Sequence, residues 1–235
     1  MRITELPDIC RETGIDLTAE MTQQFSRYME LLMEWNEKIN LTAIKDPEEF
    51  VIKHYVDSLR IAELPEFQAA ETVIDVGTGG GFPGVPLAAA APEKRFLLMD
   101  SLNKRIKVIL ELTAECGIGN VEAVHGRAED LGRDPQYREQ FDLCVSRAVA
   151  DLSVLSEYCL PFVKPGGAFI AYKGSSAEEE LGRAERAIRL LGGEVLRVDH
   201  AGIDNMEHRF IVIRKVRHTQ KAYPRKAGTP AKSPL

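Results

Sequence analysis

The run from Thr72 to Gly84 constrains the fold of this chain most strongly. Its first five residues, Thr-Val-Ile-Asp-Val, are β-prone or apolar residues around one acid, Asp75. A glycine cluster from Gly77 to Gly81 follows at once. Such a turn lets a ligand approach bare backbone, because no Cβ stands in the way. The pattern predicts a buried strand over 72–76 that opens into a ligand-binding turn.

The chemistry of this turn separates two classes of ligand. Gly79, Gly81 and Gly84 fit the dinucleotide fingerprint by spacing. Pro83, however, removes an N–H where a pyrophosphate needs donors. Asp75 lies at the strand end, where a carboxylate can accept hydrogen bonds from a cationic amino group or order a water beside it. S-adenosylmethionine carries such a group and no phosphate, so the turn favours it over NAD.

Two further strand ends carry acids. Asp100 closes the segment 95–100 and is placed to hold two ribose hydroxyls, a feature that NAD and S-adenosylmethionine sites share. The segment 121–125 reads as a third strand. In the loop after it, the backbone around Ala128 and the side chain of Glu129 can bond an adenine edge. Acids at or just after three successive strand ends therefore predict a nucleoside ligand.

The alternative for such acids is a solvated loop residue or a helix N-cap. We expect that role for Asp130, which follows the same strand as Glu129. We do not expect it for Asp75 or Asp100, because three acids in these positions are harder to obtain by chance than one glycine turn.

Composition bounds the class and the compartment. A length of 235 residues, with 44% hydrophobic and 28% charged residues, suits one α/β domain with an extension. No apolar stretch reaches membrane-spanning length, and the start of the chain lacks a signal-peptide core. The four cysteines show no Cys-x-x-Cys pairing, and Cys144 and Cys159 lie in apolar runs typical of core thiols. We expect a cytoplasmic protein.

Strands and helices alternate from Thr72 onward, which predicts a parallel sheet wound on both faces. The expected strands are 72–76, 95–100, 121–125, 141–146, 168–173, 194–199 and 209–215, and the expected helices are 84–91, 102–116, 151–161 and 176–191. Only a turn, Gly202 to Glu207, separates the last two strands, so they should form an antiparallel edge hairpin. This predicts an α/β fold: the seven-stranded, Rossmann-like sheet of S-adenosylmethionine-dependent methyltransferases.

The first part of the chain predicts a helical extension. Apolar residues recur at helical spacing after Thr18, a candidate N-cap, and they are Met21, Phe25, Tyr28, Leu32 and Trp35. Asp46-Pro47-Glu48-Glu49 opens a second helix. His54, Asp57 and Ser58 share one face of it. They either cap or tether the extension to the body or, as we expect, line a substrate cleft. The predicted parts are residues 1–65, 66–216 and 217–235.

The charge is unevenly distributed. The net charge is −6, yet Arg217 to Leu235 holds five Lys or Arg and no acid, which leaves −11 for the rest. A basic tail on an acidic body predicts a local anionic contact, although a solubilising tail is the alternative. We expect Pro224, Pro230 and Pro234 to keep this tail from becoming helical.

The loop after the fourth strand indicates the acceptor of a methyl group. Amine acceptors go with an Asn/Asp-Pro-Pro-aromatic loop and pyrimidine C5 with a Pro-Cys or Thr-Cys nucleophile, and the segment 141–150 has neither. Cys144 lies inside the strand, so the acceptor should be nucleophilic without a base, as guanine N7 is. Arg147 can donate to guanine O6, to the cofactor or to phosphate. An ion pair with Asp142 or Asp151 is its alternative role.

Taken together, these motifs resemble the RsmG family of bacterial 16S ribosomal RNA guanine-N7 methyltransferases, formerly called glucose-inhibited division protein B. The segments that carry the resemblance are Asp75–Ala88, Asn40–Thr42, His54-x-x-Asp57-Ser58, Ser146–Ala148 and Pro224–Pro230. The resemblance implies S-adenosylmethionine as donor and a guanine N7 in the decoding-region loop of 16S rRNA, or of a small-subunit precursor, as acceptor. We expect a monomer that binds neither DNA nor membrane.

The candidate sites follow from the resemblance together with the glycine turn and the basic tail. The cofactor-binding residues are Gly77, Gly79, Phe82, Asp100, Ser101, Ala128, Glu129 and Arg147, and the RNA-binding residues are Arg147, Lys221, Arg225, Lys226 and Lys232. No catalytic residue and no metal ligand is assigned. The alternatives are a small-molecule methyltransferase, a non-catalytic ribosome-binding or division-related factor, and an NAD-dependent enzyme.

Overall fold

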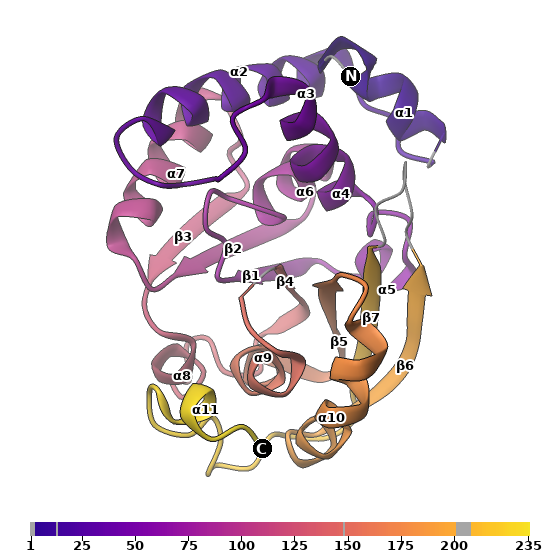
Figure 1. The fold of residues 1–235 in the computed structure, drawn as a ribbon, viewed down its shortest axis with the longest axis vertical. Coiled ribbons are helices and arrows are strands. Elements are labelled where there is room, and N and C mark those ends of the chain that lie inside the picture. The colour runs from indigo at the N-terminus through magenta and orange to yellow at the C-terminus, as the bar shows by residue number, and fades with distance from the viewer. Residues whose placement is uncertain (1–2, 13, 148, 201–207) are drawn as a thin grey trace. The chain divides into compact units, whose positions relative to one another are not determined.

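The computed structural model describes residues 3–12, 14–147, 149–200 and 208–235 of the chain (Figure 1). Its strands form one mixed sheet in the order β3-β2-β1-β4-β5-β7-β6. Their bounds are β1 Thr72–Val76, β2 Arg95–Asp100, β3 Val121–His125, β4 Phe141–Arg147, β5 Val163–Lys173, β6 Gly193–His200 and β7 Arg209–Lys215. The predicted α/β class and seven-stranded sheet are confirmed.

The pairing of the strands explains their composition. β1 pairs with β4, β2 with β3, and β4 with β5, all parallel. β7 is antiparallel to both β5 and β6, so the predicted antiparallel pair at the sheet edge is confirmed, with β7 on its inner side. The turn predicted between these two strands lies outside the described residues. The middle of the central strand β4, residues 143–145, is apolar and buried, as expected for a strand covered on both faces.

The helices expected inside the sheet domain are present. They are α6 Gly84–Ala90, α7 Asn103–Glu115, α9 Leu152–Cys159 and α10 Ala177–Leu190. The shorter elements are the 3-10 helices η1 Ile3–Glu5 and η3 Leu160–Phe162, the π-helix η2 Val51–Val56, and α1 Leu6–Glu12, α3 Pro47–Phe50, α4 Asp57–Leu59, α5 Pro65–Gln68, α8 Ala128–Leu131 and α11 Thr229–Lys232. Helices of three or four residues leave almost no periodic signal in a sequence.

The long N-terminal helix, α2 Ala19–Asn36, forms for the reasons that the sequence indicates. The Thr18 side chain accepts a hydrogen bond from Met21 N at 3.2 Å and caps the helix. The middle of the apolar stripe, Phe25 to Leu32, is buried. Asp46 likewise caps α3, accepting from Glu49 N at 2.8 Å. Both predicted caps are confirmed.

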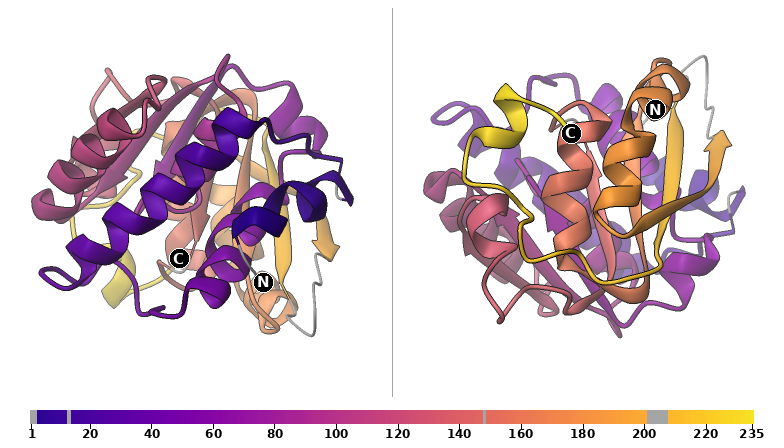
Figure 2. Two further views of the ribbon diagram at one scale, coloured as in Figure 1. Left: turned by 90° about the horizontal axis from the view of Figure 1, so that it is seen from above. Right: turned by 90° about the horizontal axis from the view of Figure 1, so that it is seen from below.

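The chain divides into two compact units that cut across the predicted parts. The first unit holds residues up to Glu71 and Thr78–His125, and the second holds Thr72–Gly77 and residues from Gly126 onward. The N-terminal helices thus belong to the unit that contains β2 and β3, where α2 packs on α6 and α7. In the second unit, α9 and α10 pack against each other beside the strands (Figure 2).

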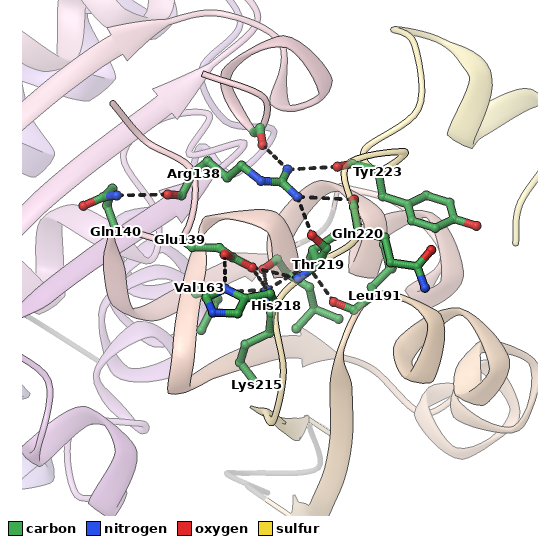
Figure 3. A network of polar contacts seen from close by, with 12 residues as sticks. Arg138, Glu139, Gln140, Val163, Leu191, Lys215, His218, Thr219, Gln220 and Tyr223 are labelled. Atoms are coloured by element: carbon green, nitrogen blue, oxygen red, sulfur yellow. Dashed lines mark hydrogen bonds and ion pairs between the residues drawn. The ribbon is translucent and has the colours of Figure 1, made fainter. Parts of the chain in front are cut away.

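The basic tail is part of the second unit. We call residues 216–235 the C-terminal strap, because they run past α9 to α11 (yellow in Figure 2). The Arg138 guanidinium donates to the backbone carbonyls of Thr219 at 2.7 Å and Tyr223 at 2.8 Å (Figure 3). The expectation that prolines keep the tail from becoming helical is wrong for α11. Pro230 occupies its first turn, where a missing N–H costs no hydrogen bond.

A buried lysine holds the beginning of the strap. The Lys215 amine is fully buried and donates to Leu160 O at 2.6 Å, to Val163 O at 3.1 Å and to Thr219 Oγ1 at 2.7 Å. Glu139 lies 3.2 Å from the same amine (Figure 3). The end of β7 is therefore tied to the start of β5 and to the strap by one side chain.

This burial predicts a pH dependence of stability. Burial lowers the pKa of Lys215 from 10.5 to about 8, although the Glu139 carboxylate opposes the shift. Between these values the unfolded chain binds the extra proton, so the free energy of unfolding rises with pH. We expect urea denaturation to show the wild type gaining about 3 kcal/mol relative to Lys215→Met as the pH rises through this interval.

The control for this experiment is Lys221→Met, at an exposed position of the strap. This variant should keep the wild-type pH dependence. A difference between the wild type and Lys215→Met that does not change with pH would contradict the assignment.

Candidate functional site

The residues predicted to bind the cofactor divide between the two units. Gly79, Phe82, Asp100 and Ser101 belong to the first unit, and Gly77, Ala128, Glu129 and Arg147 belong to the second. Each of these two groups of residues is held in place by its own contacts.

In the first unit, the structure brings the glycine turn and the acid of β2 together. The carboxylate of Asp100, at the end of β2, is only 4% exposed. Its Oδ2 accepts the Gly79 N–H at 3.0 Å, and its Oδ1 accepts the Leu102 N–H at 2.8 Å. Arg105 Nη1 lies 3.3 Å from Oδ2. Asp100 therefore orders the turn, a task that the sequence did not reveal. Ser101, the next residue, is exposed.

Gly79 and Gly81 of this turn differ in what a side chain at each position would contact. Both have positive φ, +60° at Gly79 and +93° at Gly81. A Cβ on Gly81 would lie 2.4 Å from Tyr28 Oη and 2.7 Å from Val85 Cγ2, so packing excludes it. A Cβ on Gly79 would meet no heavy atom of the described residues within 4 Å. We call the open space at Gly79, beside the Asp100 carboxylate, the cradle.

Phe82 packs inside an aromatic cluster rather than lying open. Its ring stacks on His54, with centroids 4.1 Å apart and planes at 5°, and contacts Phe50 edge-on. The Tyr28 hydroxyl donates to Gly80 O at 2.9 Å. The glycine turn is thus fixed to the N-terminal helices by the rings of Tyr28, Phe50 and His54, of which only Tyr28 belongs to the predicted core stripe.

The cleft interpretation of the polar face near His54 is wrong for two of its three members. Asp57 and Ser58 are buried, and the Ser58 hydroxyl donates to the carbonyl of His54. His54 is half-buried, and its Nε2 lies 2.7 Å from Thr42 Oγ1. His54 therefore tethers the loop before α3, which lies within the predicted extension, and its stacking on Phe82 is the contact that agrees with the alternative of a tether to the body.

In the second unit, Gly77 lies at the end of β1. Its φ is +76°, and a Cβ there would lie 2.5 Å from Val149 Cγ2. Asp75 is fully buried and pairs in register with Val145 of β4. The Ser146 hydroxyl donates to Val76 O at 2.7 Å. These contacts hold the end of β1 against the end of β4.

The candidate adenine-binding residues form the start of α8. Ala128 and Glu129 are both buried, and Asp130 is exposed, as expected for a solvated acid. Glu129 Oε1 accepts the backbone N–H of Gly228 at 2.8 Å. The glycine of the strap that covers Glu129 was missed, because its partner is 99 residues away and nothing local in the sequence signals it.

Arg147 is the last residue of β4 and is half-buried. The two carboxylates considered as its partners have other cations. Asp142 pairs with Lys164, and Asp151 pairs with Arg183 at 2.9 Å.

The described residues offer no covalent nucleophile of the cysteine type in this region. Cys144 is fully buried inside β4, and burial raises the pKa of its thiol far above the ordinary value, with Cys159 adding to the shift. A thiol becomes a nucleophile only as thiolate. Among all the residues that the structure describes, no group of three or more His, Cys, Asp or Glu is arranged to hold a metal ion.

Comparison with known proteins shows the family to which the chain belongs. The model of the family GidB, described as rRNA small subunit methyltransferase G, matches residues 21–210. The chain belongs to this family. A relative from Alkaliphilus oremlandii, "Ribosomal RNA small subunit methyltransferase G", is 48% identical over 98% of this chain and 99% of its own. One of the same name from Clostridium kluyveri is 44% identical over 97% and 96%.

A solved structure shows the same fold at low identity. The O-methyltransferase from Bacillus cereus in complex with SAH has a TM-score of 0.58 and 18% identity, covering 81% of this chain and 91% of its own. The chain thus shares the fold of this structure, and its family makes it a methyltransferase, which removes the NAD-dependent alternative.

The two glycines provide a matched test of the turn. Gly81→Ala adds the clash with Tyr28 and Val85 to the cost of a left-handed conformation, and Gly79→Ala adds the conformational cost alone. We expect the free energy of unfolding to fall by about 1–2 kcal/mol for Gly79→Ala and about 2–5 kcal/mol for Gly81→Ala. Urea denaturation measures both, and equal losses would contradict this account of Gly81.

Proposed function

We propose that this chain transfers a methyl group from S-adenosylmethionine to N7 of a guanine in 16S rRNA. The observation that carries the proposal is family membership along nearly the whole chain, with relatives named for methylation of small-subunit ribosomal RNA. The cradle at Gly79 and Asp100 is consistent with a nucleoside donor.

S-adenosylmethionine, when bound, supplies a methyl group on a sulfonium that the N7 lone pair takes by in-line displacement as the carbon–sulfur bond breaks. Asp100 Oδ1 accepts one backbone N–H and retains acceptor capacity for a ribose hydroxyl. Glu129 and the backbone of Ala128 are proposed to bond the adenine edge, and Gly77, Phe82 and Ser101 to line the donor. Arg147 is proposed to donate to guanine O6, to the donor or to phosphate.

We propose N7 as the acceptor atom because its methylation demands little chemistry from the protein. N7 of guanine attacks with an available lone pair and carries no proton, so the transfer needs neither a general base nor a covalent step. The chain then contributes chiefly by positioning donor and acceptor. A fully buried Cys144 agrees with a reaction that has no cysteine intermediate.

Contacts with RNA phosphates are proposed for the strap. Lys221, Lys226 and Lys232 are exposed. Arg225 was expected to join them, but its guanidinium donates to Glu157 at 2.6 Å. We therefore confine the proposed phosphate contacts to the three lysines.

The proposed setting of the reaction is the cytoplasm, with a monomeric enzyme acting on 16S rRNA or a small-subunit precursor and binding no DNA. No disulfide joins cysteines in the described part of the chain. None of the helices described there is long and apolar enough to cross a membrane.

The acceptor atom is tested by atomic substitution. We expect N7-methylguanine to appear in 16S rRNA that is incubated with the protein and S-adenosylmethionine, and mapping by abasic-site cleavage locates it. Placing 7-deazaguanine at that position should abolish transfer, because the attacking atom is gone. Cys144→Ser should retain transfer in the folded fraction. Persistent methylation of the deaza substrate would refute N7 as the acceptor.

The strap is tested by salt dependence. Each lysine that contacts a phosphate of single-stranded RNA steepens the slope of log affinity against log salt by about 0.7. Replacing Lys221, Lys226 and Lys232 together by Gln should therefore flatten the slope by about 2. Lys38→Gln, in the first unit, removes one exposed charge and is the control. A wild-type slope in the triple variant would remove the strap from the proposed RNA surface.

A further inference from the structure

We infer that the C-terminal strap positions α8 for the methyl donor, with Gly228 and Arg138 as positioning residues at the two ends of this helix. The inference rests on the proposed function, because it takes Ala128 and Glu129 as donor contacts. It adds Gly228, which is remote from α8 in the sequence, and Arg138, which follows α8 closely.

The first end of α8 is held at Glu129. Its side chain is 4% exposed, and Oε1 accepts the Gly228 N–H at 2.8 Å. A buried carboxylate is destabilising unless hydrogen bonds compensate for its lost hydration. Gly228 has φ +80°, a conformation that glycine adopts without strain. The strap thus aims one N–H at Glu129, and the second oxygen of the carboxylate can serve a ligand.

The second end of α8 is held at its C-cap, Gly132. The carbonyl of Gly132 accepts a hydrogen bond from Arg138 Nη1 at 2.8 Å. The same guanidinium donates to Tyr223 O and Thr219 O of the strap (Figure 3). A Cβ on Gly132 would lie 3.1 Å from the ring of Pro224. Arg138 and Pro224 therefore join the end of the helix to the strap.

Between these two points the strap is anchored to α9. Glu157 is fully buried, and Arg225 donates to its carboxylate from Nε at 3.0 Å, from Nη2 at 2.6 Å and from its backbone N at 2.7 Å. α8 itself packs against α9. The anchor thus lies within three residues of Gly228 and sets its position.

The shortness of α8 makes this support necessary. A helix of four residues has too few internal hydrogen bonds to hold its own orientation. Contacts from outside must therefore fix the direction of Ala128 and Glu129. If the strap shifts, these residues shift with it, and donor affinity falls.

Paired substitutions at Gly228 test the inference. Val is strained at positive φ, whereas Asn tolerates it, and a Cβ on Gly228 meets no heavy atom of the described residues within 4 Å. We expect Gly228→Val to bind S-adenosylhomocysteine about tenfold more weakly by calorimetry, which corresponds to about 1.4 kcal/mol. Gly228→Asn should remain within about twofold of the wild type, well inside that margin.

A second pair tests the anchor. Arg225→Gln removes the bidentate contact with Glu157, while Lys226→Gln removes a neighbouring exposed charge. The first should weaken S-adenosylhomocysteine binding, and the second should not. In steady-state assays, Gly228→Val and Arg225→Gln should raise KM for S-adenosylmethionine and leave KM for the small subunit unchanged, which a loss of folded protein alone would not do.

The outcomes separate the two claims. A wild type that does not bind S-adenosylhomocysteine overturns the proposed function and this inference with it. A wild type that binds, together with folded Gly228→Val and Arg225→Gln proteins of unchanged affinity, overturns this inference alone.

Discussion

The buried ion pair between Glu157 and Arg225 is the interaction on which the second unit most depends. A carboxylate that is fully removed from water is strongly destabilising unless a cation and hydrogen bonds compensate for its lost hydration. Arg225 compensates with three donors, and in doing so it holds the strap on α9. Lys215 repeats the principle nearby, since its buried amine is surrounded by two carbonyls, a hydroxyl and Glu139. Arg225, which looks suited to a solvated tail, is thus paired with a carboxylate of the interior.

The first unit uses one carboxylate in a similar way. Asp100 fixes the glycine turn through Gly79 N, and the ring of Phe82 fixes the same turn to His54. A turn of glycines is flexible by itself. The acid and the aromatic cluster give it a single shape, so an open cradle at Gly79 can exist beside a tightly packed Gly81.

The fold was predictable because its signals are local or periodic. β1, β2 and β3 begin and end at the expected residues, and the caps at Thr18 and Asp46 have the expected partners. Two features were not predictable for physical reasons. α8 and α11 are too short to show a period. The contacts of Arg225 and Gly228 join segments 68 and 99 residues apart, and one sequence holds no trace of such pairing. The role of Arg225 was misjudged for that reason, because a run of positive charge shows nothing about a buried partner.

The contact between Gly228 and Glu129 also bears on how fast the second unit folds. Closing a loop of 99 residues costs more chain entropy than closing the short loops between neighbouring strands. Contacts of such long range are slow to form, because the entropy of closing the loop is lost before the contact stabilises it. We therefore expect Glu129 to stay hydrated until the strap docks. The helix proposed to receive the donor would then be completed late in the folding of the second unit.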